Sequence, residues 1–211
     1  HALENGMDLI CLYYQMGHRY ISTTQMYLGT SLNFYRGDYE RYHPLCNRPR
    51  GGSEQVKLPV DEVLALLDAP DSLRGKLILR TLYASAMRSD EIRSLLCADV
   101  VAEERRLFLR DAKGPADAVA LIDAETAEQL VRYIAGRPMS EPVFPQIASA
   151  MTLWNLVRKA AQKVGIWHKY KDQGYSLSPH SFRHAYASHC YQQGMPPAVL
   201  SRLMGHWDPQ S

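Results

Sequence analysis

The sequence lacks the features that mark several large classes of protein. Its four cysteines, Cys11, Cys46, Cys97 and Cys190, lie far apart and form no CxxC pair. This spacing argues against a disulfide framework and against a zinc knuckle, and it predicts reduced, partly buried thiols. Eight histidines are present, but no HExxH or paired Cys/His spacing occurs. We therefore expect no metal site.

Long apolar runs are missing as well. No apolar stretch approaches the roughly 20 residues that cross a bilayer, and the start of the chain lacks the basic-then-apolar order of a signal peptide. We therefore expect no membrane partner and a cytoplasmic location. With 46% hydrophobic residues among 211, the chain has enough apolar side chains for a real core.

Neither positive nor negative charge is in strong excess, because the net charge is only +2. The charged residues are, however, unevenly distributed along the chain. Residues 60–145 hold 11 Lys and Arg against 15 Asp and Glu, whereas residues 146–211 hold 7 against 2. A basic C-terminal third is suited to face a polyanion.

The chain divides into an irregular first part and a regular second part. Residues 1–18 are predicted to be helical, with Gly17 placed to end the helix, and a Ser/Thr cap within residues 22–27 predicts another short turn or helix. Residues 28–57 are polar, aromatic and rich in Gly and Arg with little periodicity, which predicts a linker or an extended arm.

From Val60 onward the periodicity predicts a mainly helical α+β fold with a small antiparallel sheet. Ser89 is a plausible N-cap for one helix, and the run AKGPAD separates two strands of a hairpin. The predicted helices span 60–69, 72–86, 89–96, 123–136, 152–165, 180–194 and 196–205, and the predicted strands span 105–111 and 118–122.

A segment near one end of the chain repeats near the other. The stretch HALENGMDLICLYYQMGH at 1–18 aligns without a gap on HCYQQGMPPAVLSRLMGH at 189–206, with seven identical residues in eighteen positions. The spacing is far longer than that of solenoid arrays, so it does not mark a stack of small units. The repeat indicates that the same boundary segment of a domain occurs twice in the chain.

Two stretches carry residues suited to chemistry on an anion. SPHSFRHAYASH places His180 and Arg183 three residues apart, so on a helix both project from the same face. YASAMRSDEIRSLL presents Arg88 directly after an apolar helix, followed by Glu91 and by Leu95 at the spacing of a buried face.

At these residues the sequence resembles the tyrosine recombinase (phage integrase) family. Its members read G-x-R-x-x-E-x-x-x-L, a hairpin K-G, H-x-x-R-H, L-G-H, and then a tyrosine in a T-T-x-x-Y context. The matching positions are Ala86-Met87-Arg88 with Glu91 and Leu95, Lys113-Gly114, His180 to His184, and Met204-Gly205-His206. Ala86 replaces the usual glycine and Met204 the usual leucine. The resemblance implies a helical integrase-type catalytic domain and site-specific DNA recombination.

The physical logic of this set can be stated for each residue. Attack on a phosphodiester builds charge on the non-bridging oxygens, and two guanidiniums from different helices can hold these oxygens, a role that suits Arg88 and Arg183. His180 and His206 can donate further hydrogen bonds or transfer a proton. Lys113, at the hairpin tip, can protonate the departing 5′ oxygen.

The resemblance also implies a tyrosine nucleophile. Family members form a 3′-phosphotyrosyl intermediate that stores the bond energy, so neither ATP nor a metal is implied and no cofactor is expected. The tyrosine is expected about nine residues after the final histidine, but the sequence given stops at Ser211, five residues after His206. In the first copy of the repeat, Tyr27 lies nine residues beyond His18, in the context TTQMY. We therefore predict Tyr27 as the nucleophile.

These observations give a division into three parts. Residues 1–27 resemble the tyrosine-bearing end of a catalytic domain, residues 28–57 are the linker or arm, and residues 58–211 resemble a catalytic domain without its own C-terminal tyrosine. The first segment could dock on its own chain, could exchange onto a neighbouring molecule, or could be the remnant of a tandem copy. Only one of His18 and His206 can occupy a given site, and continuity with His180 favours His206.

The implied partner is double-stranded DNA, with self-association as a dimer or tetramer on the DNA and possible exchange of the tyrosine-bearing segment. Two other functions compete with recombination. One is a catalytically idle relative that binds DNA without cutting it, and the other is a type IB topoisomerase, which shares the clamp and the tyrosine chemistry. A purely structural helical protein would leave the ordered Arg, Lys, His-x-x-Arg and His series unexplained.

Overall fold

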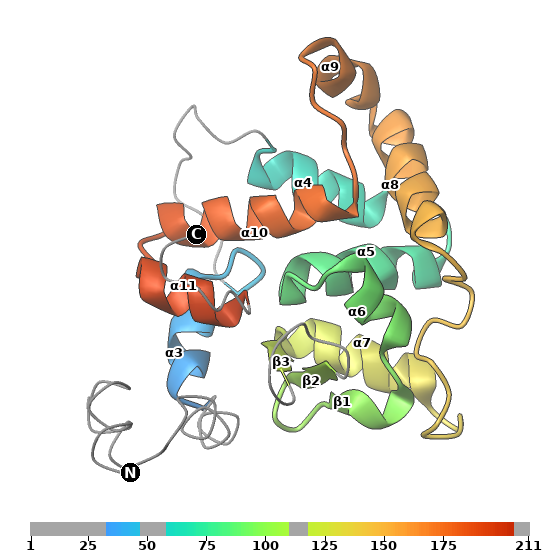
Figure 1. Ribbon diagram of the computed structural model, residues 1–211, viewed down its shortest axis with the longest axis vertical. Helices are drawn as coiled ribbons and strands as arrows, with labels where there is room; N and C mark the ends of the chain where they lie inside the picture. The colour runs from blue at the N-terminus through green and yellow to red at the C-terminus, as the bar shows by residue number, and fades with distance from the viewer. Residues whose placement is uncertain (1–32, 47–57, 110–117, 205–211) are drawn as a thin grey trace, which may run out of the picture.

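The computed structural model describes residues 33–46, 58–109 and 118–204. Within these ranges the chain is mainly helical, and a small sheet lies to one side of the helices (Figure 1). None of the helices in these ranges is long and apolar enough to cross a membrane. The helices are α3 (Asn33–Tyr42), α4 (Val60–Asp68), α5 (Leu73–Ser85), α6 (Ser89–Ser94), the 3-10 turn η1 (Cys97–Asp99), α7 (Ala124–Ile134), α8 (Ala150–Val164), α9 (Trp167–Asp172), α10 (Pro179–Gln192) and α11 (Pro197–Leu203).

The sheet is antiparallel, with β1 (Val100–Val101), β2 (Arg106–Leu109) and β3 (Ala118–Leu121) in that order. Along β2 every second residue is buried, so Leu107 and Leu109 face the helices. The predicted hairpin and the mainly helical α+β class are both confirmed. β1 was not predicted, because two residues are too few to show an alternating pattern.

Helix α5 lies at the centre of the packing. It contacts α4, α7 and α10, and Figure 1 shows it lying between α10 and the layer formed by α7 and the sheet. Leu79, Leu82 and Tyr83 are each at most 1% exposed. A helix that is apolar on all sides is stable only when other elements cover each side. The mostly apolar helix α5 meets this condition, because three other helices cover it.

Side chains set the helix boundaries largely where the sequence indicates. Ser72, Asp123 and Ser149 each cap a helix by accepting a backbone N–H three residues later. Gly165 ends α8 with a φ of 84°, a left-handed conformation that glycine adopts without steric cost. The prediction for Ser89 was wrong, because Arg88 is the N-cap of α6 and Ser89 is its first residue.

The segment predicted as a linker or arm contains a helix. Residues 33–42 form α3, which packs against α11, while residues 28–32 and 47–57 lie outside the described residues. The sequence gives little helical periodicity here because α3 buries few side chains. Tyr39 is 1% exposed, and His43, just beyond the helix end, is fully buried.

These two residues join a buried aromatic cluster. His43 stacks on Tyr39 with ring centroids 4.7 Å apart, and it also contacts Tyr83 of α5 at 5.4 Å and Tyr186 of α10 at 5.0 Å. The Tyr39 hydroxyl donates a hydrogen bond to the carbonyl of Ala84 at 2.9 Å. The cluster therefore fastens α3 to the two helices that carry the candidate site.

A second buried histidine ties α10 to the start of the domain. His189 Nε2 lies 2.8 Å from the carbonyl of Leu58, so it must be the protonated ring nitrogen, and Nδ1 accepts a hydrogen bond from the Tyr83 hydroxyl at 2.8 Å. Both ring nitrogens of this neutral imidazole are thus satisfied. Such pairing removes most of the cost of burying a polar side chain.

The cysteines within the described residues carry free thiols. Cys97 and Cys190 are buried free thiols, and Cys46 is a free thiol at the surface. Cys11 lies outside the part of the chain that the structure describes.

The two buried histidines predict a loss of stability in mild acid. Burial lowers the pKa of both His43 and His189 to about 4, whereas an unfolded histidine titrates near 6.5. Between these values the unfolded chain binds more protons, so the free energy of unfolding should fall as the pH drops from about 6.5 to about 4, by about 1.4 kcal/mol per pH unit for each histidine. Urea unfolding at several pH values measures this slope.

Replacing His43 by Phe isolates one of the two contributions. His43→Phe should lower the stability at pH 7, because Leu45 loses the acceptor of its backbone N–H, but it should also reduce the acid slope by about one proton. An unchanged slope would show that His43 does not drive the acid sensitivity.

Ala86 predicts a gain in stability. It ends α5 with a φ of 52°, a left-handed conformation that costs a residue with a Cβ about 1–2 kcal/mol. Ala86→Gly should therefore raise the free energy of unfolding by about 1 kcal/mol, measured by urea titration at pH 7. Ala84→Gly, inside α5, is the control and should lower it by a similar amount. A loss of stability in Ala86→Gly would contradict the assignment of strain to this residue.

Candidate active site

Arg88 is positioned by a carboxylate on its own helix. It stands at the junction between α5 and α6, and its guanidinium Nη1 lies 2.8 Å from Glu91 Oε1. The other oxygen of Glu91 accepts the backbone N–H of Arg88 at 2.7 Å. Glu91 is 5% exposed, whereas the Arg88 side chain is 39% exposed. A buried carboxylate therefore fixes both the main chain and the head group of an arginine that still faces solvent.

Arg183 is positioned by main-chain carbonyls. It lies on α10 and is only 4% exposed. Its Nη1 donates a hydrogen bond to the carbonyl of Ala86, and its Nη2 donates to the carbonyl of Met204. These two acceptors are the C-caps of α5 and α11, where helix carbonyls lack helical partners and the helix dipole favours a cation.

The two arginines act on each other electrostatically. Burial, followed by the positive charge of Arg88, lowers the pKa of Arg183 to about 10, while the charge of Glu91 acts in the opposite sense. Arg183 thus stays charged at neutral pH, close to a second cation and largely out of water. An anion bound beside both guanidiniums would relieve this repulsion, which makes the pair a suitable site for a phosphate group.

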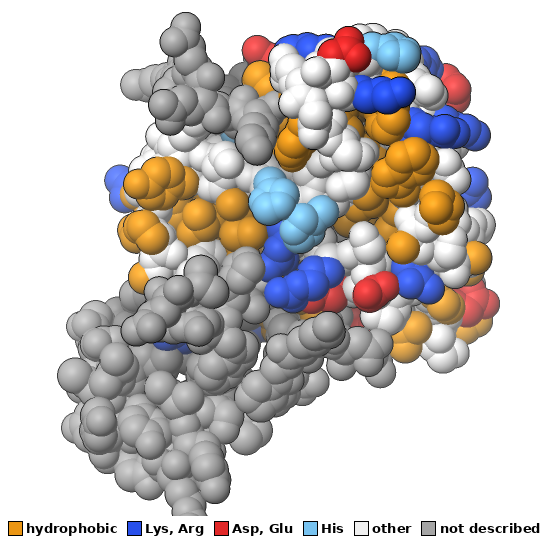
Figure 2. All heavy atoms as spheres, turned by 45° about the horizontal axis from the view of Figure 1, so that its top comes forward, with side chains coloured by type: hydrophobic (Ala, Val, Ile, Leu, Met, Phe, Trp, Pro, Cys, Tyr) orange, Lys and Arg blue, Asp and Glu red, His pale blue; other side chains and the backbone are white. Residues whose placement is uncertain are grey.

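His180 lies one turn before Arg183 on α10 and is exposed. Its ring meets that of His184, also exposed, edge to face with centroids 4.5 Å apart. Figure 2 shows histidine side chains directly beside Lys or Arg side chains near the centre of the face drawn. The structure therefore brings Arg88 and Arg183 together, from the α5–α6 junction and from α10, and His180 lies one turn before Arg183 on α10.

The other predicted residues lie outside the described residues. These are Tyr27, Lys113 and His206, together with the alternative His18. Their assignments remain predictions.

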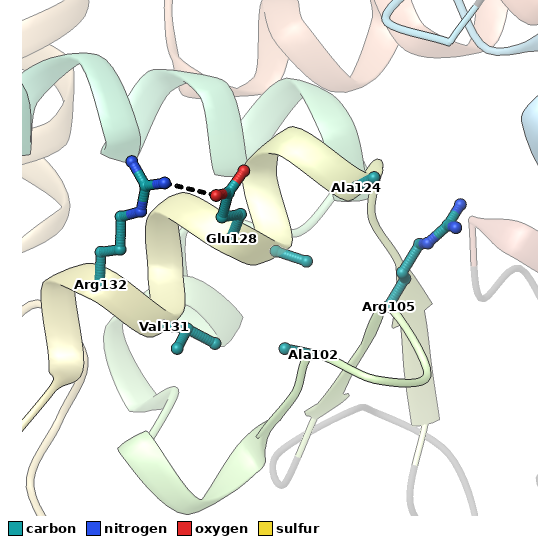
Figure 3. A pocket seen from close by; sticks show the side chains of 7 residues that line it. Ala102, Arg105, Ala124, Glu128, Val131 and Arg132 are labelled. Carbon is teal, nitrogen blue, oxygen red and sulfur yellow. Dashed lines mark hydrogen bonds and ion pairs between the residues drawn. The ribbon is translucent and has the colours of Figure 1, made fainter.

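A hollow elsewhere on the molecule shares no residue with this site. It lies between α7 and the turn that joins β1 to β2, and its volume is about 420 Å³. Figure 3 shows Ala102 and Val131 on either side of it, with the Glu128–Arg132 ion pair on the helix beside it. Its lining is mostly aliphatic, and its charged side chains, Arg105, Glu128 and Arg132, are separate from the paired arginines of the site.

Sequence reasoning missed the main-chain part of the site. The carbonyls of Ala86 and Met204 hold Arg183, and no residue type marks a carbonyl as an acceptor. A usable signal was present at Ala86, because the related motif has glycine there and glycine marks a left-handed helix end. Glu91 was noted only as part of the motif, and its two bonds to Arg88 explain its place three residues later.

The comparisons with known proteins point to one family. The sequence model of the phage integrase family matches residues 57–211. Tyrosine recombinase XerA from Pyrococcus horikoshii is 31% identical over 157 residues, covering 71% of this chain and 52% of the relative. Tyrosine recombinase XerD from Staphylococcus epidermidis is 31% identical over 168 residues, covering 72% and 54%. The chain therefore spans about half the length of the curated relatives that it matches.

Solved structures share the fold. The crystal structure of XerA recombinase aligns with a TM-score of 0.61 at 20% identity, covering 98% of this chain and 79% of that one. The Tn1549 transposon integrase, solved in complex with transposon right end DNA, aligns with a TM-score of 0.57 at 15% identity, covering 97% and 79%. The family match over most of the chain, on a fold that holds Arg88 and Arg183 together, shows that the chain belongs to the phage integrase family, the tyrosine recombinases.

Proposed function

We propose that this chain carries out site-specific DNA strand cleavage and rejoining through a 3′-phosphotyrosyl intermediate. The observation that carries the proposal is the pair of arginines. Arg88 and Arg183 are held by separate partners, and they lie close enough for one charge to lower the pKa of the other. This arrangement suits a phosphodiester, whose two non-bridging oxygens can each accept hydrogen bonds from one guanidinium.

The proposed reaction is a transesterification. The tyrosine hydroxyl attacks the phosphorus, the bond from phosphorus to the 5′ oxygen breaks, and that oxygen takes a proton from a general acid, for which Lys113 is the candidate. His180 and His206 stabilise the charge that develops on the phosphate oxygens. A 5′ hydroxyl then attacks the phosphotyrosine and restores the backbone. One ester is exchanged for another, so the cycle needs neither ATP nor a metal.

Tyr27 is the proposed nucleophile, and the described copy of the repeat supports this choice. Five of the seven matched positions can be seen there, and each is structurally constrained. His189 is bonded at both ring nitrogens, Gly194 has a φ of 94°, Met195 and Met204 are 1% and 9% exposed, and Leu200 packs against the core.

The first copy retains these same residue types, at His1, Gly6, Met7, Leu12 and Met16. Two buried positions depart, because Cys190 corresponds to Ala2 and Leu203 corresponds to Gln15. The pattern is that expected of a segment selected to fill the same place in a domain of this fold, directly before a TTxxY tyrosine.

The position of α3 supplies a second argument for Tyr27. Only five residues lie between Tyr27 and Asn33, the first residue of α3, so the six Cα–Cα steps keep the two Cα atoms within about 20 Å of each other. α3 packs against α11, and the last turn of α11 leads to Met204, whose carbonyl holds Arg183. A tether of this length supports delivery of Tyr27 within the same chain. Exchange between neighbouring molecules and a tandem remnant are the alternatives.

Double-stranded DNA is the proposed partner, bound by a dimer or a tetramer. The basic balance of residues 146–211 suits a polyanion, and α10 with Arg183 lies in that range. The Tn1549 integrase was solved with its transposon DNA, which supports the same partner for this chain.

Removing Arg88 tests the clamp. Arg88→Ala should lower the rate of strand cleavage by about 10²–10³-fold, because one donor to the developing charge is lost. It should also lower the melting temperature, because the buried Glu91 carboxylate loses its guanidinium partner, so cleavage is measured well below that temperature. Arg93→Ala is the matched control, since Arg93 is on the same helix and pairs with Asp90 at 2.9 Å in the same i,i+3 geometry. Arg183→Lys should also impair cleavage, but its melting temperature must be checked because the side chain is buried. Near-normal cleavage by Arg88→Ala would sink the assignment.

Covalent capture tests the nucleophile. The full chain is incubated with a pool of nicked duplexes that carry randomised half-sites, so that cleavage releases a short strand and traps the protein on the DNA. Denaturing electrophoresis should show an adduct, and sequencing of the trapped strand should give the target. The adduct should disappear in Tyr27→Phe and persist in Tyr20→Phe.

Each other outcome of this capture has a definite meaning. An adduct that persists in Tyr27→Phe would assign the nucleophile elsewhere. DNA binding without any wild-type adduct would favour the catalytically idle relative. Relaxation of supercoiled plasmid without recombined product would favour a topoisomerase.

A further inference from the structure

Two exposed histidines lie next to each other on α10, and only one of them has a role above. His180 and His184 are four residues apart on this helix, and their ring centroids are 4.5 Å apart at an interplanar angle of 85°. Side chains four residues apart on a helix project from the same face. The helix therefore brings two imidazoles into contact at the protein surface.

The separation of these rings suits the binding of one metal ion by both. Imidazole is the commonest metal ligand in proteins, and it suits zinc, nickel and copper. Zinc–nitrogen bonds of about 2.0–2.1 Å, at a ligand–metal–ligand angle of roughly 90–110°, place the centres of two imidazole rings roughly 4.5–5 Å apart. The observed separation of 4.5 Å agrees with this value. Rotation about the Cβ–Cγ bonds, which is soft for histidine, can turn one nitrogen of each ring towards a shared ion.

The surroundings of the pair allow an exchangeable ion and not a structural one. His180 takes part in a further interaction within the protein, which does not exclude metal binding, because a metal-bound histidine ligates through one ring nitrogen and usually keeps a protein partner at the other. Among the described residues no group of three or more His, Cys, Asp or Glu side chains could hold an ion. With only two protein ligands, water completes the coordination, and such a site differs from the closed centres that the sequence argues against.

We propose that His180 and His184 form a two-ligand site for a divalent transition-metal ion such as Zn²⁺, and that a bound ion inhibits strand cleavage. The inhibition rests on the proposed function, in which His180 stabilises the charge on the phosphate oxygens. Metal ligation occupies a ring nitrogen of His180 and fixes the ring beside His184, so it competes with hydrogen bonding to the phosphate. Mg²⁺ should have no such effect, because it prefers oxygen ligands to imidazole.

The binding experiment adds Zn²⁺ to the full chain at about pH 7.5, because histidine must be neutral to bind a metal. Long-range ¹H–¹⁵N NMR spectra observe each imidazole separately, and His180→Gln and His184→Gln assign the two rings. We expect both rings to shift along one saturation curve, and Mg²⁺ to leave them unchanged. His184→Gln should weaken zinc binding at His180 by at least about tenfold, because even the loss of a group that only orients a ligand costs about 10–100-fold in metal affinity.

The activity experiment measures single-turnover cleavage of the captured target, and the rate of each protein with Zn²⁺ is compared with its own rate in EDTA. Zinc should slow the wild type, with half-inhibition at the concentration that half-saturates the two rings. His184→Gln should need at least about tenfold more zinc for the same inhibition. The matched control is His168→Gln, because His168 is an exposed histidine of another helix, α9, and this variant should respond to zinc as the wild type does.

Three results would overturn the proposal. A zinc shift of one ring without the other would exclude the two-ligand site. Zinc inhibition that is unchanged in His184→Gln would show that the ion acts elsewhere, since the chain has eight histidines and four cysteines. A joint shift of both rings without any inhibition would overturn the effect on cleavage.

The ring signals also separate this inference from the proposed function. If the wild-type chain forms no adduct with DNA, the proposed function fails, but the zinc titration still tests the site. A joint shift of His180 and His184 that is lost in His184→Gln would then support the metal site, and its absence would overturn it.

Discussion

The buried guanidinium of Arg183 is the constraint on which the site depends. Moving a charged group out of water costs several kcal/mol unless hydrogen bonds replace the lost hydration. Here the replacements are the C-cap carbonyls of α5 and α11, both at helix ends where a cation is favourable. Arg183 can therefore be buried only if both helices end where they do. The left-handed turn at Ala86, which aims one of these carbonyls, is thus part of the site and not only a connection between helices.

Helix α10, which carries Arg183, is also held in place by buried contacts away from the site. One turn and a half further along α10, His189 joins the Tyr83 hydroxyl of α5 to the carbonyl of Leu58. Tyr186, between them, contacts His43 beyond the end of α3. The first half of α10 therefore presents functional side chains while the second half is fixed by buried polar and aromatic contacts. This division suits a site in which charges must stay in place against mutual repulsion, because a preorganised group needs no reorientation when the substrate arrives.

The sequence predicted the elements better than it predicted their contacts. The hairpin and the helices from α4 to α11 other than α9 follow from periodicity and turn chemistry, which are local properties. α3 was missed because its stability comes from Tyr39 and the adjoining His43, which are buried among residues 40 or more positions away. The motif identified Arg88, His180 and Arg183, but not the acceptors of Arg183, because a carbonyl acceptor is defined by where a distant helix ends. Ser89 was misplaced by one residue because Glu91 caps the helix from within.

The repeat adds a steric argument to the proposed delivery of Tyr27. In the described structure, residues 189–204 run from His189, which bonds to the carbonyl of Leu58, to Met204, whose carbonyl accepts a hydrogen bond from Arg183. This position is therefore already filled in the domain and is not available to the matching residues 1–16. α3, by contrast, is docked on this domain through Tyr39. Tyr27 is thus separated from a docked helix by five residues. If Tyr27 acts within its own chain, the short tether therefore requires it to approach the arginines from the side of α3.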